Sequence, residues 1–131
     1  MTKRWTDVVR ERYAAFNRGD WDTAFRVFDD SFEVHDHTLP DAPVFRGRDA
    51  MRKNLAEMTD AFEDMSYEPD RVLELGDRVL VQVRASGRGK ESGIEVGGIV
   101  GHLWTVKESR ILRLDIYQGW TEALEAVGRR E

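Results

Sequence analysis

The sequence predicts an α+β fold in which three N-terminal helices pack on the concave face of a curved antiparallel sheet. Two observations carry this prediction. Apolar residues recur at helical spacing up to Phe62, and from Ser66 onward they alternate with polar residues at the period of a strand. Helices followed by hairpin-connected strands are typical of the α+β class, and an isolated meander needs helices to cover one face. With 131 residues, the chain is expected to form a single domain over 1–131.

Three helices are expected in the first half of the chain. The first is indicated by apolar residues spaced by four, four and three positions, namely Trp5, Val9, Tyr13 and Phe16. Segment 17–20 (Asn-Arg-Gly-Asp) breaks this pattern, because glycine suits a helix end and Asp20 suits the N-cap of a second, short helix. A third helix is expected after Gly47. The apolar stripes of the second and third helices are Trp21, Phe25 and Phe28, and Met51, Leu55, Met58 and Phe62.

The first strand is expected between the second and third helices. Segment 31–37 alternates with period two, so Phe32, Val34 and Asp36 share one face and Glu33, His35 and His37 share the other. The segment that follows, 38–44, contains two prolines and is expected to be a loop.

The second half of the chain is expected to be a meander. Segment 75–78 (Leu-Gly-Asp-Arg) predicts a tight hairpin turn, and the glycine-rich segment 86–93 predicts a second turn. A long strand over 94–106, a turn over 107–110 and a last strand over 111–118 follow. Segment 121–124 predicts a short terminal helix.

Composition excludes several classes of function. The net charge is −5 and basic residues are mixed with acidic ones, which disfavours a nucleic-acid partner. The absence of cysteine excludes disulfides, thiolate metal sites and a cysteine nucleophile. No stretch approaches the ~20 apolar residues of a membrane helix, and the first nine residues contain no apolar run of signal-peptide length. We therefore expect a cytoplasmic protein without membrane contacts.

Three segments resemble a known family in sequence and in order. They are 13–21 (Tyr-Ala-Ala-Phe-Asn-Arg-Gly-Asp-Trp), 45–48 (Phe-Arg-Gly-Arg) and the ending 104–128 with its helix at 123–126. They are similar to nuclear-transport-factor-2-like domains, and the ending is similar to the SnoaL-like branch. The resemblance implies a cone in which helices and a bent sheet enclose a pocket, and an outer sheet face that often forms a dimer. Because the family includes ketosteroid isomerases, polyketide cyclases, dehydratases, epoxide hydrolases and non-catalytic binders, the fold leaves the function open.

Asp36 is the first candidate for acid/base chemistry. Its place on the apolar strand face would desolvate the carboxylate and raise its pKa toward that of a useful base. It also falls at the position of the general-base aspartate in the ketosteroid isomerases that the chain resembles. The alternative is an Asx-turn residue that closes the strand. The two acids that bind the substrate oxygen in the isomerases have no counterpart in this sequence. Their positions fall on Arg12 and on Gly101, and Tyr13 lies one residue after Arg12.

His102 is the second candidate, and its orientation stays open. The polyketide cyclases of the SnoaL-like branch use a histidine and an aspartate whose positions fall on Gly101 and Ile116, each one residue away from His102 and Asp115. A shift of one residue reverses the face of a strand. Periodicity favours the even face as the inward one (Val96, Val100, His102, Trp104), whereas the family correspondence favours the odd face (Ile99, Gly101, Leu103).

A metal site is considered and set aside. His35 and His37 share a strand face with Glu33, which could form half of a site, but the sequence offers no evident third ligand. We therefore expect no metal and no cofactor.

Together these points predict a small-molecule pocket protein with isomerase-, cyclase- or dehydratase-type chemistry on a small, mostly apolar carbonyl or cyclic substrate. The catalytic candidates are Asp36, His102 and Tyr13. The expected substrate contacts are Phe16, Trp21, Phe25, Phe45, Leu55, Met58, Phe62 and Trp104. The alternative is a non-catalytic ligand-binding or dimerisation module of the same fold. Because the long strand carries apolar residues on both faces, we also expect a homodimer through the outer sheet face.

Overall fold

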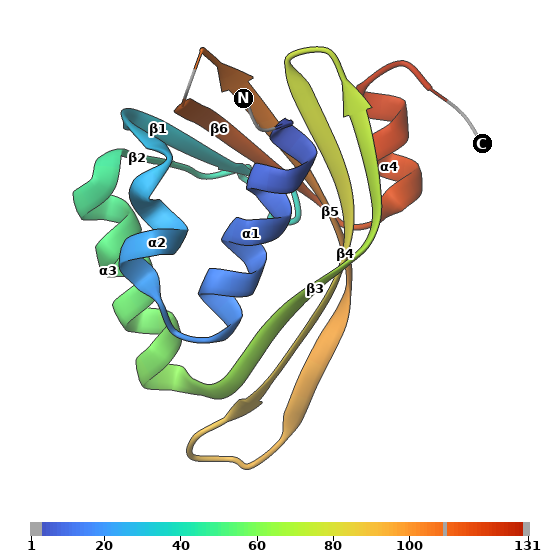
Figure 1. Ribbon diagram of the computed structural model, residues 1–131. Helices are drawn as coiled ribbons and strands as arrows, with labels where there is room; N and C mark the ends of the chain where they lie inside the picture. The colour runs from blue at the N-terminus through green and yellow to red at the C-terminus, as the bar shows by residue number, and fades with distance from the viewer. Residues whose placement is uncertain (1–3, 109, 130–131) are drawn as a thin grey trace.

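A curved, unclosed sheet with helices on both sides forms the core of the computed structural model, which describes residues 4–108 and 110–129 (Figure 1). The helices are α1 (Trp5–Asn17), α2 (Trp21–Arg26), α3 (Gly47–Ala61) and α4 (Trp120–Ala126). The strands are β1 (Phe28–Asp36), β2 (Val44–Arg46), β3 (Phe62–Leu75), β4 (Arg78–Gly89), β5 (Glu95–Lys107) and β6 (Arg110–Tyr117). None of the helices described is long and apolar enough to cross a bilayer.

The strands lie in the order β2-β1-β6-β5-β4-β3, and the predicted α+β class is confirmed. The structure differs from the expected all-antiparallel sheet at one pair, because β1 and β6 run parallel. Period-two alternation shows which face of a strand is buried, but it carries no information on the direction of a partner some 80 residues away. All other neighbours are antiparallel, and β3 and β4 are joined by the predicted two-residue turn at 76–77.

The first helix ends where the sequence predicts, and Asn17 explains how its end is fixed. The Asn17 side chain accepts a hydrogen bond from the backbone N–H of Tyr67 (2.8 Å) and donates to the carbonyl of Tyr67 (3.0 Å), which ties α1 to β3. Gly19 then adopts a left-handed φ of 78° that favours glycine. Asp20 caps α2 by accepting from the N–H of Thr23.

The concave face of the sheet packs against α1 and forms the main core. Val9 and Tyr13 from α1 pack there on the inward residues of the strands, which include Phe32, Val81 and Trp104. The inward face of β5 is therefore the even face, as periodicity indicated, and the family correspondence was off by one residue. Phe62 was expected in the stripe of the third helix, but α3 ends at Ala61 and Phe62 begins β3.

The terminal helix α4 lies on the opposite, convex face (Figure 1), so the helices do not all cover one face. Ala123 and Leu124 pack there on Leu80 and Leu103. Gly101 permits this approach, because a Cβ atom at that position would lie 2.7 Å from the Cβ of Ala123 and 2.9 Å from a backbone oxygen. The second apolar face of β5 is thus partly covered within one chain.

Candidate functional site

A cavity of about 260 Å³ opens between α2, α3 and β1. Its volume is just below the range usual for ligand pockets, so it fits a small molecule. Most of its wall is aromatic or aliphatic, with three charged residues among the lining. The lining residues are Trp21, Asp22, Phe25, Phe28, Phe32, Arg48, Met51, Arg52 and Leu55.

Three of the expected substrate contacts, Trp21, Phe25 and Leu55, line this cavity. Phe16 and Met58 belong to a cluster that also holds Trp21 and Leu55, so they support the wall without forming it. The other expected contacts lie elsewhere: Phe45 packs against the main core, Phe62 lies at a shallow depression beside Met65, and Trp104 is fully buried behind Tyr13.

Sequence reasoning missed six lining residues. For Phe28, Phe32 and Met51 the signal was present, because each lies on an apolar stripe that the periodicity identified. The charged residues gave no such signal. Arg48 is held in place by donating to Asp30 (2.8 Å) and to the backbone carbonyls of Phe25 (3.3 Å) and Phe28 (2.6 Å), which fixes the end of α2 beside the cavity.

A chain of buried hydrogen bonds lies between α1 and β5. Trp104 Nε1–H donates to the Tyr13 hydroxyl at 2.9 Å, and that hydroxyl lies 2.6 Å from Nδ1 of His102. Since the hydroxyl oxygen already accepts from Trp104, the remaining role for its proton is donation to Nδ1. His102 then carries its own proton on Nε2, for which no hydrogen bond to a described residue is present.

Burial keeps both members of the Tyr13–His102 pair neutral. Desolvation, aided by the nearby charge of Arg12, lowers the pKa of His102 from 6.5 to about 3. Desolvation also raises the pKa of the Tyr13 phenol. At neutral pH the pair therefore offers hydrogen-bond donors and no charge, which suits the polarisation of a substrate oxygen better than proton abstraction.

Arg12 is a buried cation surrounded by aromatic rings. Its guanidinium carbon lies 5.0 to 5.6 Å from the ring centroids of Tyr13, Phe16, Phe28 and Trp104, and only 9% of the residue is exposed. Its Nε atom is fully buried without a hydrogen-bond partner, and no ion pair or hydrogen bond joins it to the described part of the chain. Desolvation lowers the pKa of Arg12, but an arginine stays charged at neutral pH.

Asp36 does not reach the cavity. Its Oδ1 accepts hydrogen bonds from the backbone N–H of Thr38 (3.0 Å) and from the Thr38 hydroxyl (2.5 Å), which is an Asx turn at the start of the 38–43 loop. The structure thus gives Asp36 the alternative role, because the turn that follows the strand pulls its carboxylate back onto the backbone.

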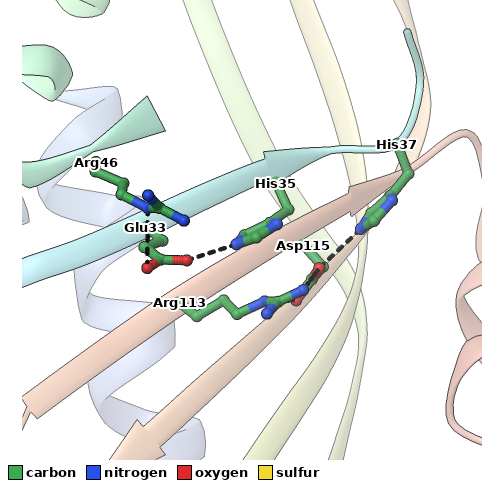
Figure 2. A network of polar contacts seen from close by, with 6 residues as sticks. All are labelled: Glu33, His35, His37, Arg46, Arg113 and Asp115. Atoms are coloured by element: carbon green, nitrogen blue, oxygen red, sulfur yellow. Dashed lines mark hydrogen bonds and ion pairs between the residues drawn. The ribbon is translucent and has the colours of Figure 1, made fainter. Parts of the chain in front are cut away.

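The convex face of β1 and β6 carries a polar network on the far side of the sheet from α1 (Figure 2). His37 bonds to Asp115 at 2.7 Å, and Arg113 donates twice to the same carboxylate. His35 bonds to Glu33 at 2.7 Å, and Arg46 pairs with that glutamate at 3.2 Å. His102 and Asp115 are therefore on opposite faces and do not form a pair.

This network holds a carboxylate that is almost fully buried. Desolvation would raise the pKa of Asp115, but hydrogen bonds from Arg113 and His37 outweigh it and lower the pKa. Each histidine is already bonded to one carboxylate, and the described residues contain no group of three or more potential ligands arranged for a metal ion.

The chain is similar to known proteins in sequence and in fold. The family profile of the SnoaL-like domain matches residues 9–114. The chain belongs to the SnoaL-like domain family. This confirms the resemblance seen in the three sequence segments. Among curated proteins no sequence matches the chain.

Solved structures share the fold of this SnoaL-like domain. A nuclear-transport-factor-2-like protein from Burkholderia thailandensis is 21% identical over 88% of this chain and 91% of its own, with a TM-score of 0.78. A candidate polyketide cyclase from Xanthomonas campestris is 25% identical over 86% and 87%, with a TM-score of 0.74. TerC, crystallised with polyporic acid, is 18% identical over 92% and 95%, also with a TM-score of 0.74.

Proposed function

We propose that this SnoaL-like domain binds a small, mostly apolar carbonyl or cyclic compound in the α2–α3–β1 cavity and polarises its oxygen, as in isomerisation, cyclisation or dehydration. The main observation behind this proposal is the buried series of hydrogen bonds from Trp104 through Tyr13 to His102. It leaves the Nε2–H of His102 without a partner among the described residues. A neutral, preorganised donor in a dry site favours charge that develops on a substrate oxygen. TerC, which was co-crystallised with polyporic acid, supports a cyclic ligand for this fold.

The donors lie behind the residues that line the cavity. Phe28 lines the cavity, and its ring lies 6.0 Å from that of Trp104. Tyr67 packs in the same cluster as the lining residue Leu55, and its ring lies 6.2 Å from that of His102. A ligand whose oxygen is polarised by His102 therefore has to extend from the cavity past these rings.

A non-catalytic binder is the second candidate. The observation that favours it is the Asx turn at Asp36, which occupies the carboxylate first expected as the base. Among the described residues that line the cavity, the one carboxylate is that of Asp22, which is exposed on the first turn of α2. Binding without proton transfer would then be the whole function.

Exchange of the methyl protons of 2-acetylnaphthalene in D₂O, followed by proton NMR, separates the two candidates. A polarising site should accelerate the exchange by roughly 10²-fold over that in the His102→Phe variant, which is the usual worth of a positioned acid or base. A binder should take up the ketone, as calorimetry would show, and leave the exchange rate unchanged.

The site of binding is checked with two variants on α3. Leu55→Trp fills the cavity and should abolish uptake of the ketone, whereas Lys53→Trp adds the same ring at an exposed position and should leave it intact. Wild-type protein that takes up no apolar ketone at all would contradict the pocket function.

We further propose a homodimer through the convex sheet face. Ile99 is 42% exposed on the same face of β5 as Leu103, beyond the cover of α4. Sedimentation at tens of micromolar, on the order of ordinary dimer affinities, should give a dimer. Ile99→Lys should shift it to a monomer, and Val96→Lys, an exposed position on the other face, should not. A wild-type monomer at that concentration would refute the proposal.

A further inference from the structure

Arg12 is the feature that the proposed function leaves unexplained. Arg12 lies on α1, and its guanidinium carbon is 5.1 Å from the ring of Trp104 on β5. Its Nε atom is fully buried without a hydrogen-bond partner. A buried charge is costly and is normally paired with an opposite charge or a set of acceptors. The four surrounding rings recover part of that cost by cation–π contact, but they provide no acceptor for the N–H groups.

Two further donors lie beside this guanidinium. Tyr67 packs on the ring of Phe16 (5.2 Å between centroids), and the Arg12 guanidinium carbon lies 5.0 Å from the same ring. His102 packs on the ring of Tyr13 (5.8 Å), which Arg12 also contacts at 5.5 Å. In the described chain the Tyr67 hydroxyl and the His102 Nε2 make no hydrogen bond. A cation and two neutral donors therefore lie in one aromatic cluster, and no described residue accepts a hydrogen bond from the Arg12 guanidinium, the Tyr67 hydroxyl or the His102 Nε2.

We propose that this cluster is an anion site and that the ligand of the cavity is an aromatic or cyclic compound that carries a carboxylate or an enolate-type oxygen, which Arg12 binds with help from Tyr67 and His102. The inference rests on the proposed pocket function and adds to it the charge of the ligand. Phe28 belongs both to the cavity wall and to the rings around Arg12, so the ligand's apolar body fills the cavity and its anionic end passes this ring.

A pair of probes of nearly the same shape tests the charge. 2-Naphthoate carries a carboxylate, and 2-naphthamide replaces it with a neutral amide. Charge-assisted hydrogen bonds to Arg12 should make wild-type protein bind naphthoate about 10- to 100-fold more tightly than naphthamide in calorimetry. Arg12→Met should remove this preference, and Arg12→Lys should keep part of it.

Arg52 provides the matched control, because it also lines the cavity but is exposed. Arg52→Met should leave the preference for naphthoate nearly intact, and the preference should persist at high salt, since buried charges are screened less than exposed ones. Loss of the preference in Arg52→Met but not in Arg12→Met would overturn the assignment. A spectroscopic readout is independent of affinity: the Arg12 Nε–H resonance should move on addition of naphthoate and stay with naphthamide.

The outcomes separate this inference from the function it rests on. If 2-acetylnaphthalene and naphthamide bind but naphthoate gains nothing, the anion site is refuted and the pocket function stands. If naphthoate binds through Arg12 while the ketone exchanges no methyl protons, the anion site stands and oxygen polarisation fails. If none of the probes binds, both are refuted.

Discussion

Lowering the pH from 7.5 to 5 should cost the protein about 2 kcal/mol of unfolding free energy through His102 alone. His102 is buried and neutral in the fold, with a pKa of about 3, whereas an unfolded histidine has one near 6.5. Between these values the unfolded chain binds more protons than the folded one, so stability falls as the pH drops below 6.5 and stops falling near 3. At pH 5 the difference is about 1.5 pH units at about 1.4 kcal/mol each.

Urea unfolding of wild type, His102→Phe and Tyr13→Phe at both pH values measures this loss. His102→Phe removes the titrating group and should flatten the pH dependence, although its absolute stability is lower because Tyr13 loses an acceptor. Tyr13→Phe removes the same hydrogen bond but keeps the buried imidazole, so it should retain the loss. Contributions from all other groups are common to the three proteins and cancel. An unchanged pH dependence in His102→Phe would show that His102 is not buried as a neutral group.

Most local elements were predictable because local chemistry decides them, but β2 was not expected, and Phe28 begins β1 instead of lying in the second helix. Helix α1 follows from the spacing of its apolar residues, and its end follows from a segment whose glycine adopts φ > 0 and whose Asp20 caps the next helix. The turn at 76–77 was predicted on the same grounds. The parallel pairing of β1 with β6 was not predictable, since it depends on how the whole meander returns to the first strand.

The site was harder to predict from the sequence than the fold, for two physical reasons. Strand parity placed Asp36 on the inward face. A short side chain at a strand end can instead bond to the turn that follows, and the Asp36 carboxylate accepts a hydrogen bond from the Thr38 N–H in that turn. Arg12 was passed over because the pattern search counted apolar residues only. It lies three residues after Val9 and four before Phe16, so helical spacing alone puts it on the buried face.

Arg12→Met should make the protein more stable, by about 1 to 4 kcal/mol. Replacement of buried charged groups by well-packed apolar side chains is often neutral or stabilising by that amount. Here no described residue pairs with the guanidinium, and the Nε atom has no acceptor, so the variant forfeits only cation–π contacts with rings that pack equally well on a thioether.

Arg113→Met is the matched comparison, because Arg113 donates two hydrogen bonds to a carboxylate that is only 6% exposed. Its loss leaves Asp115 with His37 alone and should lower the unfolding free energy by about 1 kcal/mol or more. Chemical denaturation at pH 7.5 should therefore give a higher unfolding free energy than wild type for Arg12→Met and a lower one for Arg113→Met.

The sign of the change in unfolding free energy in Arg12→Met shows whether Arg12 is a structural or a functional residue. A buried charge that destabilises its own fold is retained when it binds something, since proteins keep such costs where function requires them. If Arg12→Met lowers stability by more than about 1 kcal/mol, the ring contacts outweigh desolvation, and the guanidinium is a structural part of the core. If the variant is more stable and loses its preference for naphthoate, the same substitution removes a cost from the free protein and a contact from the complex, which is the behaviour of a preorganised anion site.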